Sequence, residues 1–340
     1  MSIDYGAQGD LLICYTLPMQ DPLDQAADRA LRPTSWDDYI GQEIIKENIR
    51  ILLRAAQERN HNPDHVLFYG PPGLGKTTLA HLIARELGRP MKATSGPALE
   101  KVGDLAALLT NLTPGDVVFI DEIHRLNKTI EEVLYPAMES GVIDIIIGKG
   151  PSARTIQLEL PPFTLVAATT KLALLSAPLR SRFSGGVHRL EYYTPDELTQ
   201  ITVKSAERLG ITAPRDAMES LALRSRATPR IANSFLRRVR DFAQVHKKDI
   251  TPELIEEALA LIGVDQHGLT ASDRLVLRAI IDNFSGGPVG VKTLAAVTGE
   301  EESTIEDVIE PYLMQKGLVE KTPRGRIATD RAYEYFGMAK

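Results

Sequence analysis

One stretch of the sequence has the residue types and spacing needed to hold the phosphates of a nucleotide. Residues 70–77 read Gly-Pro-Pro-Gly-Leu-Gly-Lys-Thr, which matches a glycine, four residues and then Gly-Lys-Thr. The stretch follows a short apolar run, 66–69, and opens a segment with helical periodicity. Glycines let backbone N–H groups close around phosphates, and the start of a helix adds a favourable dipole. We therefore expect Lys76 to reach the β- and γ-phosphates of ATP and Thr77 to ligate Mg²⁺.

An acidic pair follows the next buried-strand candidate. Asp121 and Glu122 come directly after the apolar run 117–120. A carboxylate at the end of a strand next to the phosphate-loop strand would lie at the nucleotide. We expect Asp121 to hold Mg²⁺ through water and Glu122 to act as general base on the attacking water. An acidic pair at a strand end is often only a solvated turn, but the phosphate loop upstream favours the catalytic interpretation.

Further polar residues could complete a site for phosphoryl transfer. Thr169 and Thr170 end another apolar strand, where Thr170 could sense the γ-phosphate; an ordinary threonine pair is an equally good interpretation. Phosphoryl transfer benefits from a guanidinium near the γ-phosphate, often supplied by another subunit. Arg182 is the candidate for this finger and Arg180 the second choice, with ordinary surface arginines as the alternative. A finger supplied in trans predicts a ring or another oligomer. Arg230, at the start of a later helix, could reach the same nucleotide from a second domain.

These motifs need a parallel sheet and a second domain to position them. Residues 26–190 alternate apolar runs with helical segments, the pattern of an α/β domain whose parallel sheet is covered on both faces. Residues 191–264 are helical, with Thr-Pro helix starts at 194–195 and 251–252. The predicted fold is an AAA+ P-loop NTPase core with flanking helices and a small helical lid. Residues 1–25 are expected to form an N-terminal tail, loosely ordered or docked on its own domain.

Residues 265–340 are expected to form a winged-helix domain. The predicted helix signals are, in order, a start at Thr270, a short helix at 291–297, a capping box at 303–306 and a stop at Gly317. Pro311 should kink the third helix or delay its start. Two short strands then flank residues 322–325. Three helices followed by a two-stranded wing make a winged-helix domain.

Two segments before the last core strand read as a β-hairpin. Residues 142–147 and 155–160 are separated by a Gly-Lys-Gly-Pro stretch, and the second segment alternates apolar and polar residues. A hairpin at this point is unnecessary for ATP binding. It is therefore a candidate partner-contact element, with a plain extension of the sheet edge as the alternative.

The composition limits the classes of function. The chain has 340 residues, of which 43% are hydrophobic and 25% charged, as in ordinary globular proteins. The formal net charge of -6 excludes a globally basic nucleic-acid binder, so any DNA contact must come from a local basic patch. Cys14 is the single cysteine, which excludes an intrachain disulfide and is compatible with a cytoplasmic location. The apolar run 11–15 is too short to cross a membrane, and no membrane partner is expected.

Such a basic patch lies near the C-terminus. Residues 316–340 carry more Lys and Arg than Asp and Glu, including Lys321, Arg324 and Arg326. No aromatic residue interleaves 321–326, which argues against stacking on bases. Contact with phosphates, without base readout, suits a protein that moves along any sequence. The alternative is a solvated basic turn.

Taken together, these stretches resemble the RuvB family, hexameric AAA+ ATPases that drive branch migration of Holliday junctions. The resemblance runs from about Leu31 to Phe336. Besides the phosphate loop it is carried by residues 31–33, 121–125 (Asp-Glu-Ile-His-Arg), 134–139 (Leu-Tyr-Pro-Ala-Met-Glu), 168–170, 178–183, 228–233 and 322–326 (Thr-Pro-Arg-Gly-Arg). The phosphate loop and the Asp-Glu pair are common to all AAA+ proteins. Far more specific are the Ile-His-Arg extension at 123–125, the Tyr-Pro-Ala-Met-Glu segment at 135–139 and the terminal Thr-Pro-Arg-Gly-Arg at 322–326.

The resemblance implies a role for each matching residue. The adenine pocket would be lined by Leu31, Arg32, Tyr39, Ile40 and Tyr193. The phosphates and Mg²⁺ would be bound by Gly73, Gly75, Lys76, Thr77 and Thr78. Arg182 would be the finger acting in trans, and Arg230 the second sensor of the nucleotide. The wing would touch the DNA backbone through Lys321, Arg324 and Arg326.

The resemblance also implies partners. They are double-stranded DNA at Holliday junctions, RuvA docked on the hairpin at about 142–160, the RuvC resolvase, and further copies of the chain in a homohexameric ring. The implied setting is homologous recombination and DNA repair.

The chain departs from the family pattern at two points. After the Arg-Phe pair the family usually has one glycine and then an apolar residue, whereas this chain has Ser184-Gly185-Gly186, one residue longer. That change could alter how the finger is held. Lys321 stands where the family typically has arginine; lysine keeps the charge but loses the bidentate fork.

Other classes of function fit the sequence less well than a branch-migration motor. A clamp-loader subunit would lack the terminal wing. A sequence-specific initiator should have a base-reading helix, whereas residues 303–315 carry Glu306, Asp307 and Glu310, which would repel DNA. Intact Glu122 and Arg182 argue against a scaffold that binds ATP without hydrolysing it. A protein unfoldase is disfavoured because no aromatic-glycine pore-loop pattern lies between the strands.

Overall fold

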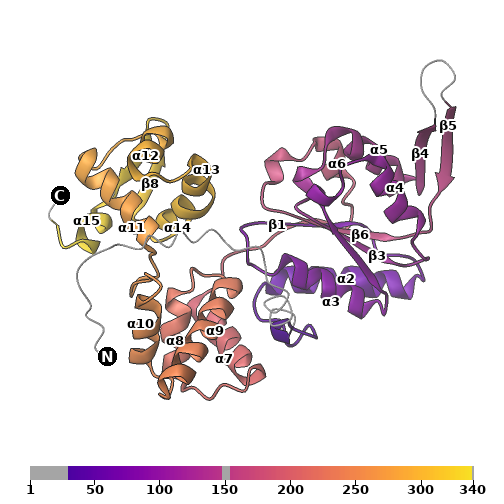
Figure 1. Ribbon diagram of the computed structural model, residues 1–340. Helices are drawn as coiled ribbons and strands as arrows, with labels where there is room; N and C mark the ends of the chain where they lie inside the picture. Colours follow the sequence, from indigo (N-terminus) through magenta and orange to yellow (C-terminus); the bar gives the residue numbers. More distant parts are fainter. Residues whose placement is uncertain (1–29, 148–153, 339–340) are drawn as a thin grey trace, which may run out of the picture. The chain divides into compact units, whose positions relative to one another are not determined.

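The computed structural model describes residues 30–147 and 154–338 (Figure 1). The chain divides into an N-terminal unit, Met1–Arg32, and a second unit, Pro33–Lys340, which contains all the elements discussed below. Among the described residues, no helix has both the length and the apolar character required to cross a bilayer.

A five-stranded parallel sheet forms the core of the first domain. Its strands are β1 (Val66–Tyr69), β2 (Met91–Ser95), β3 (Val117–Asp121), β6 (Thr164–Thr169) and β7 (Val187–Arg189). They stand in the order β2-β3-β6-β1-β7, and all neighbouring pairs are parallel. Strand β6 therefore lies between the phosphate-loop strand β1 and the acidic strand β3, so the expectation that β1 and β3 are direct neighbours is wrong. The reason is the crossover of the chain, which returns after the hairpin to fill the central position.

Helices cover both faces of this sheet, as predicted (Figure 1). They are α2 (Glu43–Glu58), α3 (Lys76–Glu86), α4 (Val102–Thr110), α5 (Lys128–Glu139) and α6 (Ala177–Ser181). Alternate residues of a strand point to opposite faces. Phe68 accordingly packs in one apolar cluster with α2 and α3, whereas its neighbour Leu67 packs in a second cluster with α4, α5 and α6. The sheet is thus buried on both sides, which fixes the strand ends that carry the polar residues.

The predicted hairpin is present. Strands β4 (Val142–Ile147) and β5 (Arg154–Glu159) pair antiparallel as a separate two-stranded sheet, with Ile143 opposite Leu158 (Figure 1). The loop of the hairpin, 148–153, lies outside the described residues.

Four helices form the small second domain. They are α7 (Pro195–Arg208), α8 (Arg215–Arg224), α9 (Pro229–His246) and α10 (Pro252–Ala260). The predicted Thr-Pro starts are confirmed, since Thr194 caps the N–H of Glu197 and Thr251 caps that of Leu254. Apolar residues of these helices belong to the same cluster as α2 and α3, so the small domain packs on that side of the core.

The C-terminal domain has the predicted winged-helix fold. Its elements are α11 (Ala271–Arg278), α12 (Val291–Thr298), α13 (Glu302–Thr304), α14 (Glu310–Gln315), β8 (Val319–Thr322), β9 (Gly325–Ala328) and α15 (Asp330–Tyr335). Thr270 caps α11 with Asp273 in a reciprocal capping box. Strands β8 and β9 pair antiparallel as the wing. The domain has an apolar core of its own.

The third helix begins differently from the prediction. Ser303 lies inside α13, and the residue before that helix, Glu301, makes no side-chain cap. A π-helical turn, Ile305–Ile309, then leads into α14, which has Pro311 in its first turn. Proline lacks an N–H and its ring collides with the carbonyl four residues earlier in an α-helix. The wider π turn accommodates both effects, so the chain continues through Pro311.

Candidate functional site

The phosphate loop has the conformation of an anion cradle. Gly70, Gly73 and Gly75 have positive φ values of 137°, 81° and 102°, and Gly75 directly precedes α3. A side chain at Gly75 would begin 2.7 Å from the hydroxyl of Tyr39, so the loop has room only for glycine there. No side chain caps the first N–H groups of α3, which leaves them to a ligand.

Lys76 is turned into this loop. Its Nζ donates to the carbonyls of Gly70 at 2.7 Å and Pro71 at 2.8 Å, and the residue is only 7% exposed. Burial lowers the pKa of Lys76 to about 8, while Glu122 and Asp121 act in the opposite direction. A phosphate would add negative charge beside this buried ammonium, which is what the predicted role of Lys76 requires.

Thr77 and Asp121 bring together the oxygen atoms that suit Mg²⁺. The Thr77 hydroxyl donates to Oδ2 of Asp121 at 3.4 Å across the ends of α3 and β3. Burial raises the pKa of Asp121, the charge of Glu122 acts in the same direction, and the N–H of Glu122, which donates to Oδ1 of Asp121, acts in the opposite one. A cation beside this buried carboxylate would be favourable. Mg²⁺ typically takes one or two protein oxygens plus substrate phosphates and water. The described residues contain no cluster of three His, Cys, Asp or Glu, so they fit this open coordination rather than a closed protein cage.

Glu122 is held at the ends of two strands by three polar contacts. Its Oε2 accepts from the Thr170 hydroxyl at 3.0 Å and from the Thr170 N–H at 3.4 Å. Nδ1 of His124 lies 3.1 Å from the same oxygen and 2.9 Å from the hydroxyl of Thr169. Among the described residues, no bond to the other oxygen, Oε1, is found. The carboxylate is thus fixed through one oxygen and has the second available.

The contact of His124 with Glu122 was not predicted, although His124 belongs to the family pattern. Its side chain is 8% exposed, and burial lowers its pKa, which favours the neutral ring. We assign the ring proton to Nδ1, because a bare nitrogen would face the lone pairs of the carboxylate. The sequence offers one clue, which is that a polar residue stands two positions after Glu122. In the structure a short 3-10 turn, Ile123–Arg125, begins directly after Glu122 and carries His124.

Two tyrosines expected at the adenine pocket lie together behind the loop. Tyr39 and Tyr193 are 3% and 5% exposed, with hydroxyls 3.1 Å apart. Tyr193 also lies 3.2 Å from the carbonyl of Leu74 in the phosphate loop, and burial raises the pKa of Tyr193 to about 12. Both rings therefore pack against the loop. Ile40 is half-buried, directly after Tyr39.

The other residues that the sequence predicted to bind the nucleotide lie at different places. Thr78 lies in the first turn of α3 and is half-buried. Leu31 and Arg32 belong to the N-terminal unit, and their expected place at the adenine stays a prediction. Arg230 is the second residue of α9; its N–H donates to the carbonyl of Gly73 at 3.4 Å. The charge of Arg230 also affects the pKa values of Lys76 and Asp121, so the small domain brings this arginine to the phosphate loop.

Arg182 follows α6 and makes its contacts away from the phosphate loop. It donates to Oε2 of Glu139 and to the carbonyl of Pro178, both at 2.8 Å, and lies 4.9 Å from the ring centre of Tyr135. Its Nε is buried without a partner. These contacts hold the guanidinium against α5 and α6, and the role of Arg182 as a finger for a neighbouring subunit stays a prediction.

The extra residue after this arginine lies in a tight connection to β7. The N–H of Gly185 donates to the carbonyl of His65 at 2.9 Å, and that of Leu67 to the carbonyl of Gly186 at 3.0 Å. A Cβ on Gly185 would lie 2.8 Å from the carbonyl of Asp64. The longer connection is therefore fastened to the start of β1 by its own backbone.

The three basic residues of the wing have different environments. Arg324 is exposed at the tip between β8 and β9. Lys321 is half exposed and lies 3.2 Å from Glu310 and 3.8 Å from Glu306. Arg326, in contrast, is buried and donates to Glu310 and Glu306 at 2.8 Å. Burial alone would lower the pKa of Arg326, but these two carboxylates raise it overall.

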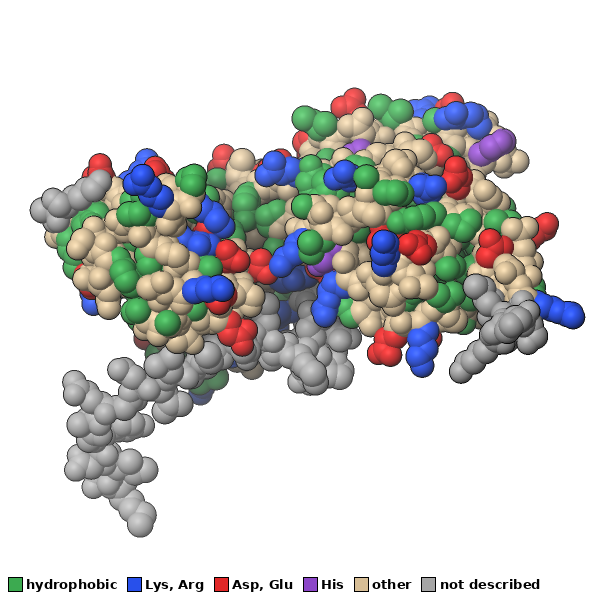
Figure 2. Space-filling view, turned by 90° about the horizontal axis from the view of Figure 1, so that it is seen from above, with side chains coloured by type: hydrophobic (Ala, Val, Ile, Leu, Met, Phe, Trp, Pro, Cys, Tyr) green, Lys and Arg blue, Asp and Glu red, His purple; other side chains and the backbone are tan. Residues whose placement is uncertain are grey.

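The expectation that all three residues touch DNA stays a prediction, and Arg326 differs from the other two in lying inside the wing. Its guanidinium is already occupied by carboxylates of α14 and the π turn before it, because an arginine that enters the protein interior must be paired. Figure 2 shows Lys and Arg interspersed with Asp and Glu over the face in view, without one large basic area.

Comparison with known proteins covers nearly all of the described chain. The family model of the Holliday junction DNA helicase RuvB P-loop domain matches residues 31–190, that of the RuvB AAA lid domain residues 193–265, and that of the RuvB C-terminal winged helix domain residues 266–337. Among solved structures, the RuvB Holliday junction branch migration motor of Thermotoga maritima is 46% identical with a TM-score of 0.82; the match covers 92% of this chain and 99% of that chain. A mutant of the same Thermotoga protein is 47% identical with a TM-score of 0.83, over 91% and 99% of the two chains.

Proposed function

Since the chain belongs to the RuvB family, we propose that it hydrolyses ATP to move Holliday junctions, as a ring on duplex DNA that works with RuvA. The observation that carries the proposal is the Glu122 carboxylate, which Thr170 and His124 hold at the strand ends beside Lys76 and Asp121. Hydrolysis of ATP needs a base that is fixed beside the phosphate-binding loop, whereas simple nucleotide binding needs no such base.

The residues divide the work of hydrolysis as follows. The loop N–H groups and Lys76 bind the phosphates of ATP, and Tyr39 and Tyr193 support the loop from behind. Thr77 and Asp121 would hold Mg²⁺, which would supply positive charge to the phosphates when bound. Glu122 takes the proton of the attacking water on Oε1, because Oε2 is engaged by Thr170 and His124.

The second half of the site comes from other subunits and from the small domain. Arg182 supplies positive charge to the γ-phosphate of a neighbouring subunit, which explains why its contacts in its own chain lie on α5 and α6. Arg230 approaches the nucleotide of its own chain, since α9 begins against the phosphate loop. Hydrolysis then depends on the assembly of a ring, which we propose to be a hexamer.

DNA is contacted by the wing through phosphates. Arg324 and Lys321 are the exposed or half-exposed cations, whereas Arg326 supports the wing from inside. Few phosphate contacts per subunit make binding weak and salt-sensitive, and the ring multiplies them. The β4–β5 hairpin is the proposed docking element for RuvA, and Ile156 is an exposed apolar residue on it. The RuvC resolvase is proposed as a further partner, on the family relationship alone.

The test is ATP hydrolysis by the purified protein with and without a four-way DNA junction and RuvA, alongside movement of a labelled junction. We expect hydrolysis to be stimulated and strands to be exchanged only with ATP. Glu122→Gln is the matched control, because it keeps the size of the side chain and removes the base. Hydrolysis without junction movement would contradict the motor and favour a clamp-loader or initiator role.

A further inference from the structure

The turn between α8 and α9 has an unusual backbone. Arg226 and Ala227 both have positive φ, 51° and 53°, which is uncommon for residues other than glycine. Two such residues in succession persist only where the surrounding contacts hold them, and conformations of this kind gather at functional sites. The contacts on the two sides of this turn lead to different domains.

On one side the turn touches the phosphate loop. The carbonyl of Ala227 accepts from the N–H of Tyr193 at 3.1 Å, and the N–H of Arg230 donates to the carbonyl of Gly73 at 3.4 Å. A Cβ placed on Gly73 would lie 3.0 Å from the Cβ of Arg230, so the two backbones are in close contact. The turn and the phosphate loop are thus in direct contact through Arg230 and Gly73.

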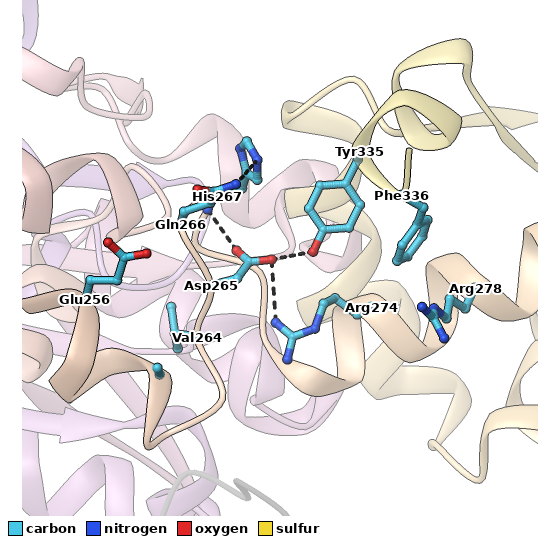
Figure 3. A pocket seen from close by; sticks show the side chains of 10 residues that line it. Glu256, Val264, Asp265, Gln266, His267, Arg274, Arg278, Tyr335 and Phe336 are labelled. Atoms are coloured by element: carbon cyan, nitrogen blue, oxygen red, sulfur yellow. Dashed lines mark hydrogen bonds and ion pairs between the residues drawn. The ribbon is translucent and has the colours of Figure 1, made fainter. Parts of the chain in front are cut away.

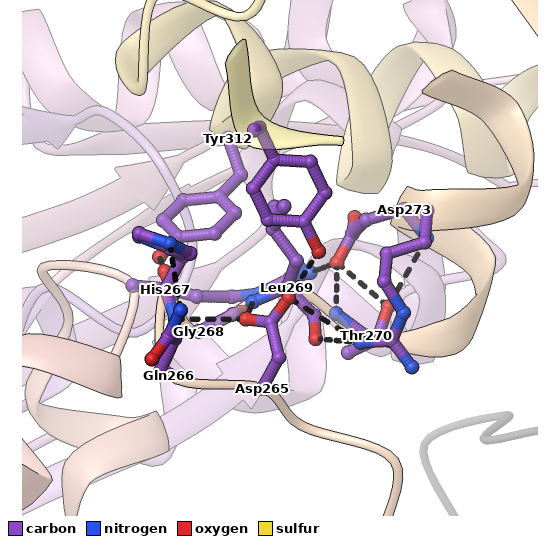
Figure 4. A network of polar contacts seen from close by, with 11 residues as sticks. Asp265, Gln266, His267, Gly268, Leu269, Thr270, Asp273 and Tyr312 are labelled. Carbon is purple, nitrogen blue, oxygen red and sulfur yellow. Dashed lines mark hydrogen bonds and ion pairs between the residues drawn. The ribbon is translucent and has the colours of Figure 1, made fainter. Parts of the chain in front are cut away.

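On the other side the Arg226 side chain contacts Asp273 and Tyr312 of the C-terminal domain, two residues that Figure 4 shows within their polar network. It forms an ion pair with Asp273, whose side chain is fully buried, and its guanidinium lies 4.6 Å from the ring centre of Tyr312. The same oxygen of Asp273 caps α11 by accepting from Thr270, at 2.7 Å from its N–H and 2.6 Å from its hydroxyl. The other oxygen of Asp273 is buried without a partner, so Arg226 is the cation that this carboxylate depends on.

The linker next to this ion pair is also polar. Tyr312 donates to the carbonyl of His267 at 2.8 Å, and one oxygen of Asp265 accepts from the N–H of His267 and of Leu269 at 2.8 and 2.9 Å. The other oxygen of Asp265 binds the hydroxyl of Tyr335 and faces Arg274 at 3.5 Å.

An open pocket lies beside this linker (Figure 3). The pocket, of about 480 Å³, is lined by α10 residues such as Glu256 and Ala260 and by Tyr335 and Phe336 of the C-terminal domain. Next to the pocket, the small domain and the C-terminal domain have separate apolar cores. The ion pair of Arg226 with Asp273 is a direct contact between the two domains at this place.

We propose that the turn 225–230 transmits the nucleotide state of the phosphate loop to the DNA-binding domain, with Arg226 as the positioning residue that drives α11. The inference deepens the proposed function and rests on its ATP binding at the phosphate loop. A nucleotide can move a remote domain only through groups whose contacts differ between its two states. The segment from Arg230 to Arg226 is a direct covalent path between such groups.

The test compares three variants. Arg226→Met with Asp273→Asn removes both charges, and the amide oxygen of the asparagine can still accept from Thr270 and cap α11, so no unpaired charge stays buried. Arg226→Lys keeps the charge and loses the fork and the stacking on Tyr312. Arg240→Met is the matched control, since Arg240 lies on α9 but pairs with its neighbour Asp241. Thermal unfolding and ATP affinity establish that each variant is folded and binds nucleotide.

The first readout is hydrogen exchange of α11 with and without Mg²⁺ and ATPγS, in the absence of DNA. We expect the nucleotide to change exchange at α11 in the unmodified protein and in Arg240→Met. The double variant should lose about fivefold or more of this response, and Arg226→Lys part of it. A double variant that responds like the unmodified protein overturns the proposal, and so does the absence of any response in the unmodified protein.

The second readout is hydrolysis and junction movement by the same proteins. The double variant should keep the KM for ATP and its basal hydrolysis, and should move about fivefold fewer junctions per ATP hydrolysed. Loss of basal hydrolysis in proportion to loss of movement would show a merely structural role and overturn the proposal. If the unmodified protein changes α11 with ATPγS but moves no junction, the proposed motor function fails and the transmission stands.

Discussion

The hydroxyl of Thr170 donates to Oε2 of Glu122 at 3.0 Å, and this bond joins the ends of two neighbouring strands, β6 and β3. The threonine expected to sense the γ-phosphate is thus in contact with the proposed base. Any shift of Thr170 toward a phosphate must loosen or turn the carboxylate. The two expected roles, sensing of the γ-phosphate by Thr170 and activation of water by Glu122, therefore depend on the same hydrogen bond.

Replacement of Thr170 by valine should lower kcat for ATP by about tenfold or more, because a base that is no longer held loses its productive geometry. The KM should change much less. Thr170→Ser is the control, since it keeps the hydroxyl. The kcat and KM of both variants are measured by steady-state kinetics. A serine variant as slow as the valine variant would contradict the role of the hydroxyl.

His124 should act as a positioning residue for the same carboxylate. His124→Ala removes the 3.1 Å contact with Oε2 of Glu122 and should lower kcat by about tenfold with little effect on KM. His124→Asn can place an amide N–H near the position of Nδ1 and should recover part of the rate. Substitution of the exposed neighbour Arg125 is the control. Equal rates for the alanine and asparagine variants would argue against the contact.

Arg182→Ala should leave ATP bound but unhydrolysed, because the phosphate loop that binds ATP in the same subunit is unchanged. When mixed with Glu122→Gln subunits, it should regain some turnover at sites that combine an intact Glu122 from one chain with an intact Arg182 from the next. Hydrolysis is measured as a function of the mixing ratio, with ring formation checked by light scattering. The absence of rescue in mixed rings would refute a finger supplied in trans.

Substitutions of the two wing arginines should have different effects, one on DNA binding and the other on the stability of the C-terminal domain. Arg324→Ala should weaken binding equally across sequences and reduce the salt slope by about 1 for each phosphate that is no longer neutralised, with unfolding unchanged. Arg326→Ala should destabilise the C-terminal domain by about 3 kcal/mol, since it leaves Glu310 buried with only Lys321 nearby. Arg326→Met with Glu310→Leu should restore stability. DNA titrations at several salt concentrations and urea unfolding measure the two effects.

Stability should fall on mild acidification because of His65. Its Nδ1 accepts from the N–H of Leu165 at 2.9 Å and its Nε2 lies 3.1 Å from the carbonyl of Met138, so the ring must be neutral. Burial lowers the pKa of His65 below its value in the unfolded chain, about 6.5. The contribution is therefore full above pH of about 6.5 and is lost as pH falls through the folded pKa. Urea unfolding between neutral and mildly acid pH should show a weaker decline for His65→Asn.

Local patterns in the sequence predicted most of the architecture. The phosphate loop, the Thr-Pro helix starts, the hairpin and the wing depend on residues close together in the chain, where spacing and turn chemistry act directly. The order of the strands cannot be predicted from such local patterns, because β6 reaches its place between β1 and β3 only through the packing of the whole sheet. The π turn before Pro311 likewise depends on how the third helix packs in its domain.

The site was predicted in the same uneven way. Lys76, Asp121 and Glu122 follow from motifs, whereas the burial of Arg326 and the contact of His124 with Glu122 depend on partners that folding brings close. The role of Arg226 was not predicted at all. Nothing near it in the sequence indicates that Asp273, 47 positions later, lies buried against it.

The β4–β5 hairpin also has a consequence for the free protein. It is a sheet of only two strands, so within the described chain each strand has an outer edge with unpaired backbone groups. Such edges template association between copies, and charged side chains such as Asp144 and Arg154 blunt them. Solubility and partner recognition therefore depend on the same few residues. A substitution that makes this hairpin more apolar to strengthen docking would also promote aggregation of subunits that have no partner.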